Sequence, residues 1–298
     1  MFFDDYDTPV FRPPSEARSF ILRLTRGCAH NQCTFCAMYK GVTFNVCTDD
    51  EISRQIAMAA QYGKDFVRRI FLADGDALVL PTEKLLKILA VLYKVFPNLQ
   101  RVSSYAAPKD ILRKSPEELI KLREAGLKLL YYGLETGDGE LLKEIKKGVT
   151  AEEAVEAGQK VIAAGMKLSL MVIAGLGGVK GSHRHAIETA KAINLIQPTM
   201  LSILTLRLYK GTEMLAKYEN NKFELLSPAG LCREAREFLS NVDIKPGHTI
   251  FRSNHVSNYV PLGGTLPQDK AKLIKELDES IEQLSDLTDW EVYTNMEY

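Results

Sequence analysis

Short apolar runs that alternate with amphipathic stretches are the feature that most constrains how this chain folds. Six such runs occur before Lys210, and each is continuously apolar, as is typical of parallel strands that are covered on both faces. They span residues 19–24, 68–76, 99–108, 127–138, 167–178 and 199–208. Helical stretches lie between them, and those that end at Gly63, Gly126 and Gly165 are expected to have a left-handed cap.

This repetition predicts a single α/β domain rather than several domains. Six strand–helix units without a break in composition favour a partial (β/α)6 TIM-like barrel. A closed eight-unit barrel would need two further units, which the chain after Lys210 does not offer. We expect an N-terminal extension over residues 1–18, a barrel core over 19–212, and a C-terminal extension over 213–298 that packs on the barrel. In that extension, helical patterns at 231–242 and 268–284 flank a turn-rich segment at 253–267.

Composition excludes several classes of protein. The 46% of hydrophobic residues can supply a large core, but no run of about 18 apolar residues indicates a transmembrane helix. The first 20 residues are acidic and interrupted by proline, unlike a signal peptide, so a cytoplasmic protein without a membrane partner is expected. The 38 basic residues balance the 38 acidic ones without a basic block. A general nucleic-acid-binding surface is therefore not expected, although a small local patch would escape this test.

Three of the five cysteines lie within nine residues, in the segment GCAHNQCTFCAMYKG. Cys28, Cys33 and Cys36 follow the first predicted strand, where the active site of an α/β barrel is built. One interpretation is a structural zinc site with Cys47 or His30 as the fourth ligand. A second is ordinary buried cysteines, and a third is an iron–sulfur cluster on three thiolates with one iron left open.

The cysteine spacing resembles the cluster motif of the radical S-adenosylmethionine (SAM) enzymes. Four residues rather than the usual three separate Cys28 from Cys33, and Phe35 stands where that family places a ring beside adenine. The resemblance implies a [4Fe–4S] cluster held by Cys28, Cys33 and Cys36, with the amino and carboxylate groups of SAM on the open iron. It covers about residues 19–212. Because Cys47 and Cys232 stand apart, no second cluster is expected.

Motifs at the ends of later strands strengthen this resemblance. Asp74, Gly75 and Asp76 stand where the family has a Gly-Gly-Glu-like segment that meets the SAM amino group. The segment YYGLETGD resembles the branch that contains the oxygen-independent coproporphyrinogen oxidase-like, elongator-like and methylthiotransferase-like enzymes. In that branch Glu135 would bond the ribose or methionyl part of SAM, and Lys147 would pair with its carboxylate.

Two further strands complete the expected cofactor site. Gly175, in MVIAGLGG, resembles the position where the backbone supports adenine, and Ser103 and Tyr105 would point inward by period-two alternation. The resulting set of cofactor-binding residues is Phe35, Asp74, Gly75, Asp76, Ser103, Tyr105, Glu135, Lys147 and Gly175.

The resemblance implies an oxygen-sensitive enzyme that cleaves SAM to a 5′-deoxyadenosyl radical and then abstracts hydrogen from a substrate. A reducing partner such as flavodoxin or ferredoxin would supply the electron. No catalytic residue is assigned, and His183 and His185 are expected at the surface. A small-molecule substrate is favoured, with modification of tRNA or a protein as the alternative, and a zinc-stabilised ligand-binding barrel as the alternative of another class. The candidate substrate contacts are Arg12, Arg207, Asn254, His255, Asn258 and Tyr259.

Overall fold

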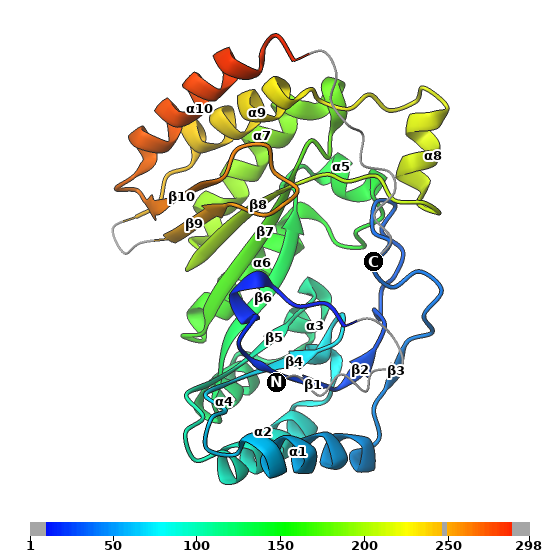
Figure 1. The fold of residues 1–298 in the computed structure, drawn as a ribbon, viewed down its shortest axis with the longest axis vertical. Helices are drawn as coiled ribbons and strands as arrows, with labels where there is room; N and C mark the ends of the chain where they lie inside the picture. Colours follow the sequence, from blue (N-terminus) through cyan, green and yellow to red (C-terminus); the bar gives the residue numbers. More distant parts are fainter. Residues whose placement is uncertain (1–9, 246–248, 288–298) are drawn as a thin grey trace.

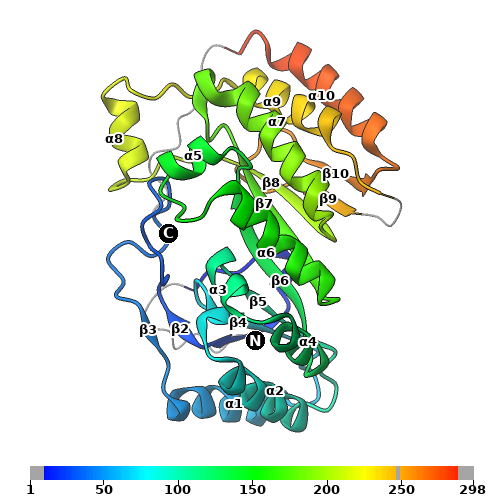
Figure 2. The same ribbon diagram turned by 180° about the vertical axis from the view of Figure 1, so that it is seen from behind.

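The computed structural model describes residues 10–245 and 249–287, so the predicted extensions are seen only within these ranges. Eight strands form one curved sheet in the order β1-β4-β5-β6-β7-β8-β9-β10, with helices on its outer face (Figures 1 and 2). Neighbours pair in parallel from β1 to β9, and only β9 and β10 are antiparallel. The strands are β1 (Phe20–Arg23), β4 (Arg69–Ala73), β5 (Arg101–Tyr105), β6 (Leu127–Glu135), β7 (Lys167–Ala174), β8 (Met200–Thr205), β9 (Thr249–Ser253) and β10 (Leu262–Leu266).

The first six strands of this sheet confirm the predicted partial barrel. Because β1 and β10 are the two ends of the strand order and do not pair, the barrel stays open. The interpretation of residues 253–267 as a turn-rich segment is wrong in part, since this segment holds β10 and borders β9. In β9 the side chains of Thr249, Phe251 and Ser253 are buried and those between them are exposed, which is the alternation of a half-buried strand.

Helices follow the strands in the expected order. Thr48, Ser115 and Thr150 each begin a helix with a capping box, which satisfies free backbone N–H groups. The principal helices are α1 (Asp49–Gly63), α2 (Thr82–Val95), α3 (Pro108–Arg113), α4 (Pro116–Glu124), α5 (Gly139–Glu144), α6 (Ala151–Ala163), α7 (Gly178–Ile196), α8 (Glu213–Glu219), α9 (Pro228–Asn241) and α10 (Lys270–Leu284).

Two local predictions fail for identifiable reasons. The sequence DILRKSPEELIKLREAG, residues 110–126, is predicted as one helix, but it forms parts of two, because Pro116 cannot continue α3 and instead occupies the first turn of α4. Gly126 and Gly165 have positive φ as predicted, but the helix continues through Gly63 without a left-handed cap.

The sheet has two differently packed faces. Residues in register across parallel strands share a face, and Phe71, Leu129 and Tyr131 form an inner cluster with Ile21 and Ala73. Tyr105 packs on this cluster with edge-to-face ring contacts to Phe71 and Tyr131. These side chains fill part of the barrel interior.

A buried acid closes the opposite end of the barrel. A short 3-10 helix, η1 (Pro14–Glu16), precedes β1 and places Glu16 fully inside. The Glu16 carboxylate accepts hydrogen bonds from Arg101 Nη2 and Tyr131 Oη, each at 2.6 Å, and a further bond from Ser19. Burying a charge requires such partners, so this part of the N-terminal extension is integral to the barrel.

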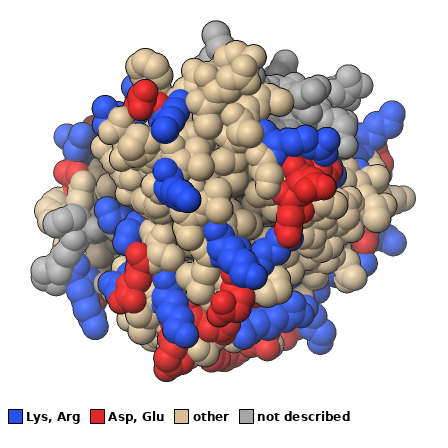
Figure 3. All heavy atoms as spheres, turned by 90° about the horizontal axis from the view of Figure 1, so that it is seen from below, with Lys and Arg blue, Asp and Glu red and all other residues tan. Residues whose placement is uncertain are grey.

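The outer surface shows little segregation of charge on the face drawn in Figure 3, where basic and acidic side chains are intermixed around an uncharged area. Helix α9 packs against both α7 and α10, which places α9 and α10 of the predicted C-terminal extension on the outer face, whereas β9 and β10 of the same extension continue the sheet beyond β8. Within the described residues, no helix combines the length and the apolarity needed to cross a membrane.

Candidate cofactor site

The three clustered cysteines lie on a partly exposed loop between two short strands, β2 (Thr25–Arg26) and β3 (Asn45–Val46). The backbone N–H of Asn31 donates to Cys28 Sγ at 3.5 Å, and Cys36 N–H donates to the Cys33 carbonyl at 3.4 Å. In the described part of the chain, no three His, Cys, Asp or Glu side chains converge as they would around a single metal ion. The loop thus holds the three thiols on a hydrogen-bonded turn without gathering them around one point.

The cysteine loop is tied to the segment that follows α5. Thr34 N–H donates to the Ile145 carbonyl at 3.0 Å, and Met214 N–H donates to the Thr34 carbonyl at 3.0 Å. His30 Nε2 lies 2.6 Å from the Lys146 carbonyl. Since His30 belongs to the four-residue spacer between Cys28 and Cys33, that spacer holds the next residue, Lys147, beside the cysteines.

A buried ion pair completes this side of the site. Lys147 Nζ lies 2.7 Å from Glu135 Oε1, and both side chains are at most 15% exposed. Burial alone would lower the pKa of Lys147, but Glu135 and the thiols of Cys33 and Cys36 outweigh it and raise that pKa. Burial raises the pKa of the Cys33 thiol to about 11, against the opposing effect of Lys147.

Backbone geometry at the end of β6 makes this pair possible. Glu135 has a positive φ of 63°, and the register with β7 shifts between Gly133 and Glu135. A Cβ at Gly133 would stand 2.1 Å from Glu135 Oε1 and 3.3 Å from Lys147 Nζ. The glycine therefore leaves the space into which the Glu135 side chain folds.

The end of β4 lies against the same loop. A Cβ on Gly75 would approach the Gly27 carbonyl to 2.7 Å and Cys28 Cα to 3.0 Å, so only glycine allows this contact. Asp74 accepts a hydrogen bond from Tyr39 Oη, and its Oδ2 lies 3.7 Å from Arg23 Nη2. All three side chains are at most 5% exposed, and they join β1, the cysteine loop and β4 in one buried network.

Comparison with known proteins identifies the family. Residues 22–190, more than half of the chain, match the model of the radical SAM superfamily. The chain belongs to this superfamily. It is 25% identical over 147 residues to the heme chaperone HemW of Bacillus subtilis (strain 168), a stretch that covers 49% of this chain and 39% of HemW. This agrees with the branch that the motif at the end of β6 predicted.

Solved structures share the fold of this radical SAM chain. Methylornithine synthase (PylB) has a TM-score of 0.53 at 17% identity, over 86% of this chain and 68% of that one. OxsB with aqua-cobalamin and SAM bound has a TM-score of 0.57 at 15% identity, over 89% and 46%. Elp3 of the archaeon Methanocaldococcus infernus has a TM-score of 0.52 at 16% identity, over 78% and 58%. The chain thus spans less than two thirds of HemW, of OxsB and of Elp3.

The thiols fit the [4Fe–4S] cluster that radical SAM family membership implies. Three cysteines lie on one loop, and backbone N–H groups at Asn31 and Met38 point at two of their sulfur atoms, as is usual for thiolates that bind iron. Cys47 is buried in the outer core with Arg26 Nη1 3.5 Å from its sulfur, and His30 is bonded to the Lys146 carbonyl. Neither of these two residues is placed as a fourth ligand.

Other residues expected to bind the cofactors lie in varied settings, most of them after the carboxyl end of a strand and Ser103 buried in the middle of β5. Phe35 packs on an apolar cluster of α5, α8 and the residues after β7 and β8. Ser103 Oγ donates to the Ile70 carbonyl at 3.3 Å. Asp76 lies fully buried beside Asp110, and burial followed by that neighbour raises the pKa of Asp76. Gly175 has a φ of 80°, and its N–H donates to Glu234 Oε1 at 2.6 Å.

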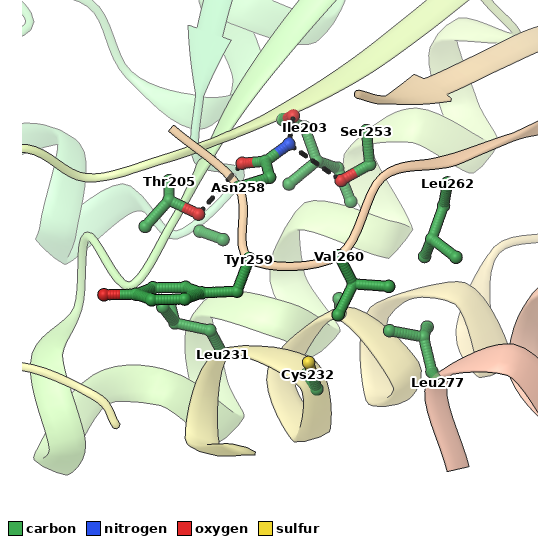
Figure 4. Close-up of a pocket in the computed structure, with 12 residues that line it drawn as sticks. Ile203, Thr205, Leu231, Cys232, Ser253, Asn258, Tyr259, Val260, Leu262 and Leu277 are labelled. Atoms are coloured by element: carbon green, nitrogen blue, oxygen red, sulfur yellow. Dashed lines mark hydrogen bonds between the residues drawn. The ribbon is translucent and has the colours of Figure 1, made fainter. Parts of the chain in front are cut away.

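The candidate substrate residues after β9 hold a loop together. Asn258 accepts a bond from Thr205 Oγ1 and donates to the Ile203 carbonyl and to Ser253 Oγ (Figure 4). Arg207 Nη2 donates to the Ser257 carbonyl at 2.9 Å.

Other members of the set of candidate substrate residues vary in their surroundings. The nitrogen His255 Nδ1 accepts from Ser257 N–H at 3.1 Å, and burial lowers the pKa of His255. Asn254 is exposed and Arg12 is half-buried.

A small cavity under the same loop is not a substrate site. Tyr259 and Asn258 line it together with Cys232 and Leu277, and it encloses about 30 Å³, far below the roughly 300 Å³ of typical ligand pockets (Figure 4).

Several polar residues that matter at the site were not predicted. Arg23 and Tyr39 join the network around Asp74, and Glu234 bonds Gly175. His185 was expected at the surface but is 2% exposed, whereas His183 is exposed as predicted. The inward position of Arg23 could have been predicted from the sequence, because period-two alternation with Ile21 places it on the inner face.

Proposed function

We propose that this radical SAM enzyme binds a [4Fe–4S] cluster on Cys28, Cys33 and Cys36, cleaves SAM reductively and abstracts hydrogen from a small-molecule substrate. The observation that carries the proposal is the buried pair of Lys147 and Glu135 beside Cys33 and Cys36. An ammonium that stays charged next to thiols favours their anionic, metal-binding form. The same cation can pair with a carboxylate such as that of SAM.

The cofactor and the residues have separate tasks in this proposal. When bound, a [4Fe–4S] cluster would supply the electron for cleavage of SAM to methionine and a 5′-deoxyadenosyl radical, which removes hydrogen from the substrate. Gly75 lets β4 approach the cysteine loop, and Glu135 offers a carboxylate for hydroxyl or amino groups of SAM. The aromatic cluster of Phe71, Tyr105 and Tyr131 closes the interior below and excludes water from it.

A small substrate fits this arrangement better than a macromolecule. Glu16 precedes β1 and is buried at the amino-terminal end of the barrel, so a substrate enters from the carboxyl ends of the strands, where the cysteine loop and Glu135 lie. Charge is intermixed on the face seen in Figure 3. Binding to RNA with a steep salt dependence would instead favour modification of tRNA. A reducing protein such as flavodoxin or ferredoxin is proposed as the electron source.

Anaerobic reconstitution with iron and sulfide tests the proposal. The expected result is a brown protein that forms 5′-deoxyadenosine from SAM and dithionite. Cys33→Ala should lose both the colour and the cleavage, while Cys47→Ala should keep them, because Cys47 is proposed to have no role in the cluster. A colourless protein that binds zinc through Cys47 or His30 would reject the proposal.

A further inference from the structure

A buried glutamate from the C-terminal extension supports the turn after β7. Glu234 on α9 is 3% exposed, and its Oε1 accepts the Gly175 N–H at 2.6 Å. A hydrogen bond to a carboxylate is stronger than one between neutral groups. The bond orients the peptide between Ala174 and Gly175, where the chain turns with a φ of 80°. The other oxygen, Glu234 Oε2, is buried without a hydrogen-bond partner among the described residues.

His185 on α7 links Glu234 to the turn after β6. Its Nε2 lies 3.7 Å from Glu234 Oε1, and its Nδ1 lies 2.8 Å from Thr136 Oγ1. Thr136 directly follows Glu135, and its hydroxyl also accepts the Asp138 N–H at 3.0 Å. The imidazole therefore contacts Thr136 in the turn after β6 and Glu234 on α9, and Glu234 in turn accepts the backbone N–H of Gly175 in the turn after β7.

The turn after β6 is fixed from a second point on α7. Gly137 N–H donates to Thr189 Oγ1 at 2.9 Å, and Thr189 is fully buried. A Cβ on Gly137 would stand 2.3 Å from the Glu188 carbonyl oxygen, so the turn lies directly on the helix. A buried polar network of this kind rigidifies the segments that it joins.

We infer that Glu234 and His185 are positioning residues, which hold the turns after β6 and β7 in the arrangement that binds SAM. This inference rests on the proposed function, because it takes Glu135 and Gly175 as parts of the SAM site. It makes α9 a component of that site, although α9 follows the strands of the barrel core in the sequence. Burial of a carboxylate with an unpaired oxygen is costly, and a network used only for packing would be replaceable by apolar side chains.

A second pair on the same two helices provides a matched control. Glu237 on α9 lies one turn after Glu234, and its Oε1 is 2.7 Å from His183 Nδ1 on α7. His183 is 79% exposed, and the bond of this pair joins α7 to α9 without a residue of either turn. The two pairs have the same chemistry and join the same helices, so they differ chiefly in burial and in the contact with the turns.

The test measures SAM binding to the anaerobically reconstituted protein by equilibrium dialysis with labelled SAM. Glu234→Ala should raise the dissociation constant about tenfold or more, since it removes a hydrogen bond to a charged group. Glu237→Ala should leave it unchanged. Glu234→Gln should recover most of the affinity, because the amide oxygen can still accept the Gly175 N–H. Thr136→Val, which is isosteric, should weaken SAM binding several-fold. If the Glu234→Ala variant does not fold, the SAM affinity of Thr136→Val tests the inference in its place.

Iron content and thermal unfolding are measured on each variant to separate positioning from general damage. If the Glu234→Ala or Thr136→Val variant is folded, contains iron and binds SAM like the wild type, the inference is overturned but the proposed function is not. Equal weakening by Glu234→Ala and Glu237→Ala would also overturn it. Absence of SAM binding by the wild type would overturn the proposed function, and the inference with it.

Discussion

Lys147 Nζ and Glu135 Oε1 lie 2.7 Å apart, at the end of β6 and beside two cysteines that are separated from them by about a hundred residues of chain. This pair is almost fully buried, and removal of one partner leaves the other charge without compensation. The ion pair therefore connects the end of β6 to the segment after α5, which contacts the cysteine loop. Substitutions at or beside this pair should have large effects on SAM binding and cleavage.

Replacement of Lys147 by methionine should weaken SAM binding and lower the reduction potential of the reconstituted cluster. Loss of a nearby positive charge disfavours the reduced form, with a shift on the order of 50 mV, equivalent to about 1 kcal/mol for one electron. Potentiometric titration followed by EPR measures this shift. Lys146→Met is the matched control, because that side chain is exposed and pairs with Glu213. A Lys147 variant with unchanged potential and SAM affinity would contradict the assignment.

Gly133→Ala should impair SAM cleavage without unfolding the protein. Its Cβ would stand 2.1 Å from Glu135 Oε1, so the carboxylate must move away from Lys147. A displacement of about 1 Å at a reacting centre can cost on the order of 100-fold in rate, and a loss of this size is expected for 5′-deoxyadenosine formation. Gly181→Ala has no heavy atom within 4 Å of its Cβ and lies in α7, so it should be active and slightly more stable. Similar activity of the two variants would refute the role of Gly133.

The parts of the fold that depend on local pattern were predictable from the sequence. Continuous apolar runs identified the six parallel strands, and motif positions at their carboxyl ends converge because parallel strands end at one edge. The β9–β10 hairpin was missed because neither of its strands, TIFRS and LGGTL, is a continuous apolar run. Turn residues such as Gly263 and Asn254 also gave the segment the composition of a loop.

Buried charges were the least predictable feature of the site. Glu16 is buried by Arg101 and Tyr131, more than 80 residues away, and nothing in its own neighbourhood indicates this. The same is true of Glu234, which meets Gly175 across 59 positions. Apolar periodicity identifies which face of a helix is inside, but it assigns polar residues to the outside by default. The burial of His185 was missed for that reason.

His30→Ala should make the protein lose iron more readily. The variant removes the 2.6 Å contact with the Lys146 carbonyl and frees the spacer between Cys28 and Cys33. Partners that orient a metal-binding loop contribute about 10- to 100-fold to metal retention, whereas one hydrogen bond changes the free energy of unfolding by only about 1.5 kcal/mol or less. A chelator challenge followed by absorbance measures the loss. Gln32→Ala, an exposed position in the same spacer, should behave like the wild type.

Asp76→Asn should change how stability depends on pH. Burial, and then the neighbouring Asp110, raise the pKa of Asp76 well above 3.8, so the folded state keeps a proton that the unfolded chain releases. The stabilisation that protonated Asp76 contributes to the free energy of unfolding is therefore fully present below the ordinary pKa of an aspartate in the unfolded chain. It is lost as the pH rises through the raised pKa of the folded state. Asparagine avoids this loss, because its amide donates to Asp110 without ionising. In urea unfolding, the free energy of unfolding of the variant relative to that of the wild type should increase by about 1 kcal/mol or more between pH 5 and pH 8. A constant difference across that range would mean that Asp76 is already ionised in the folded protein.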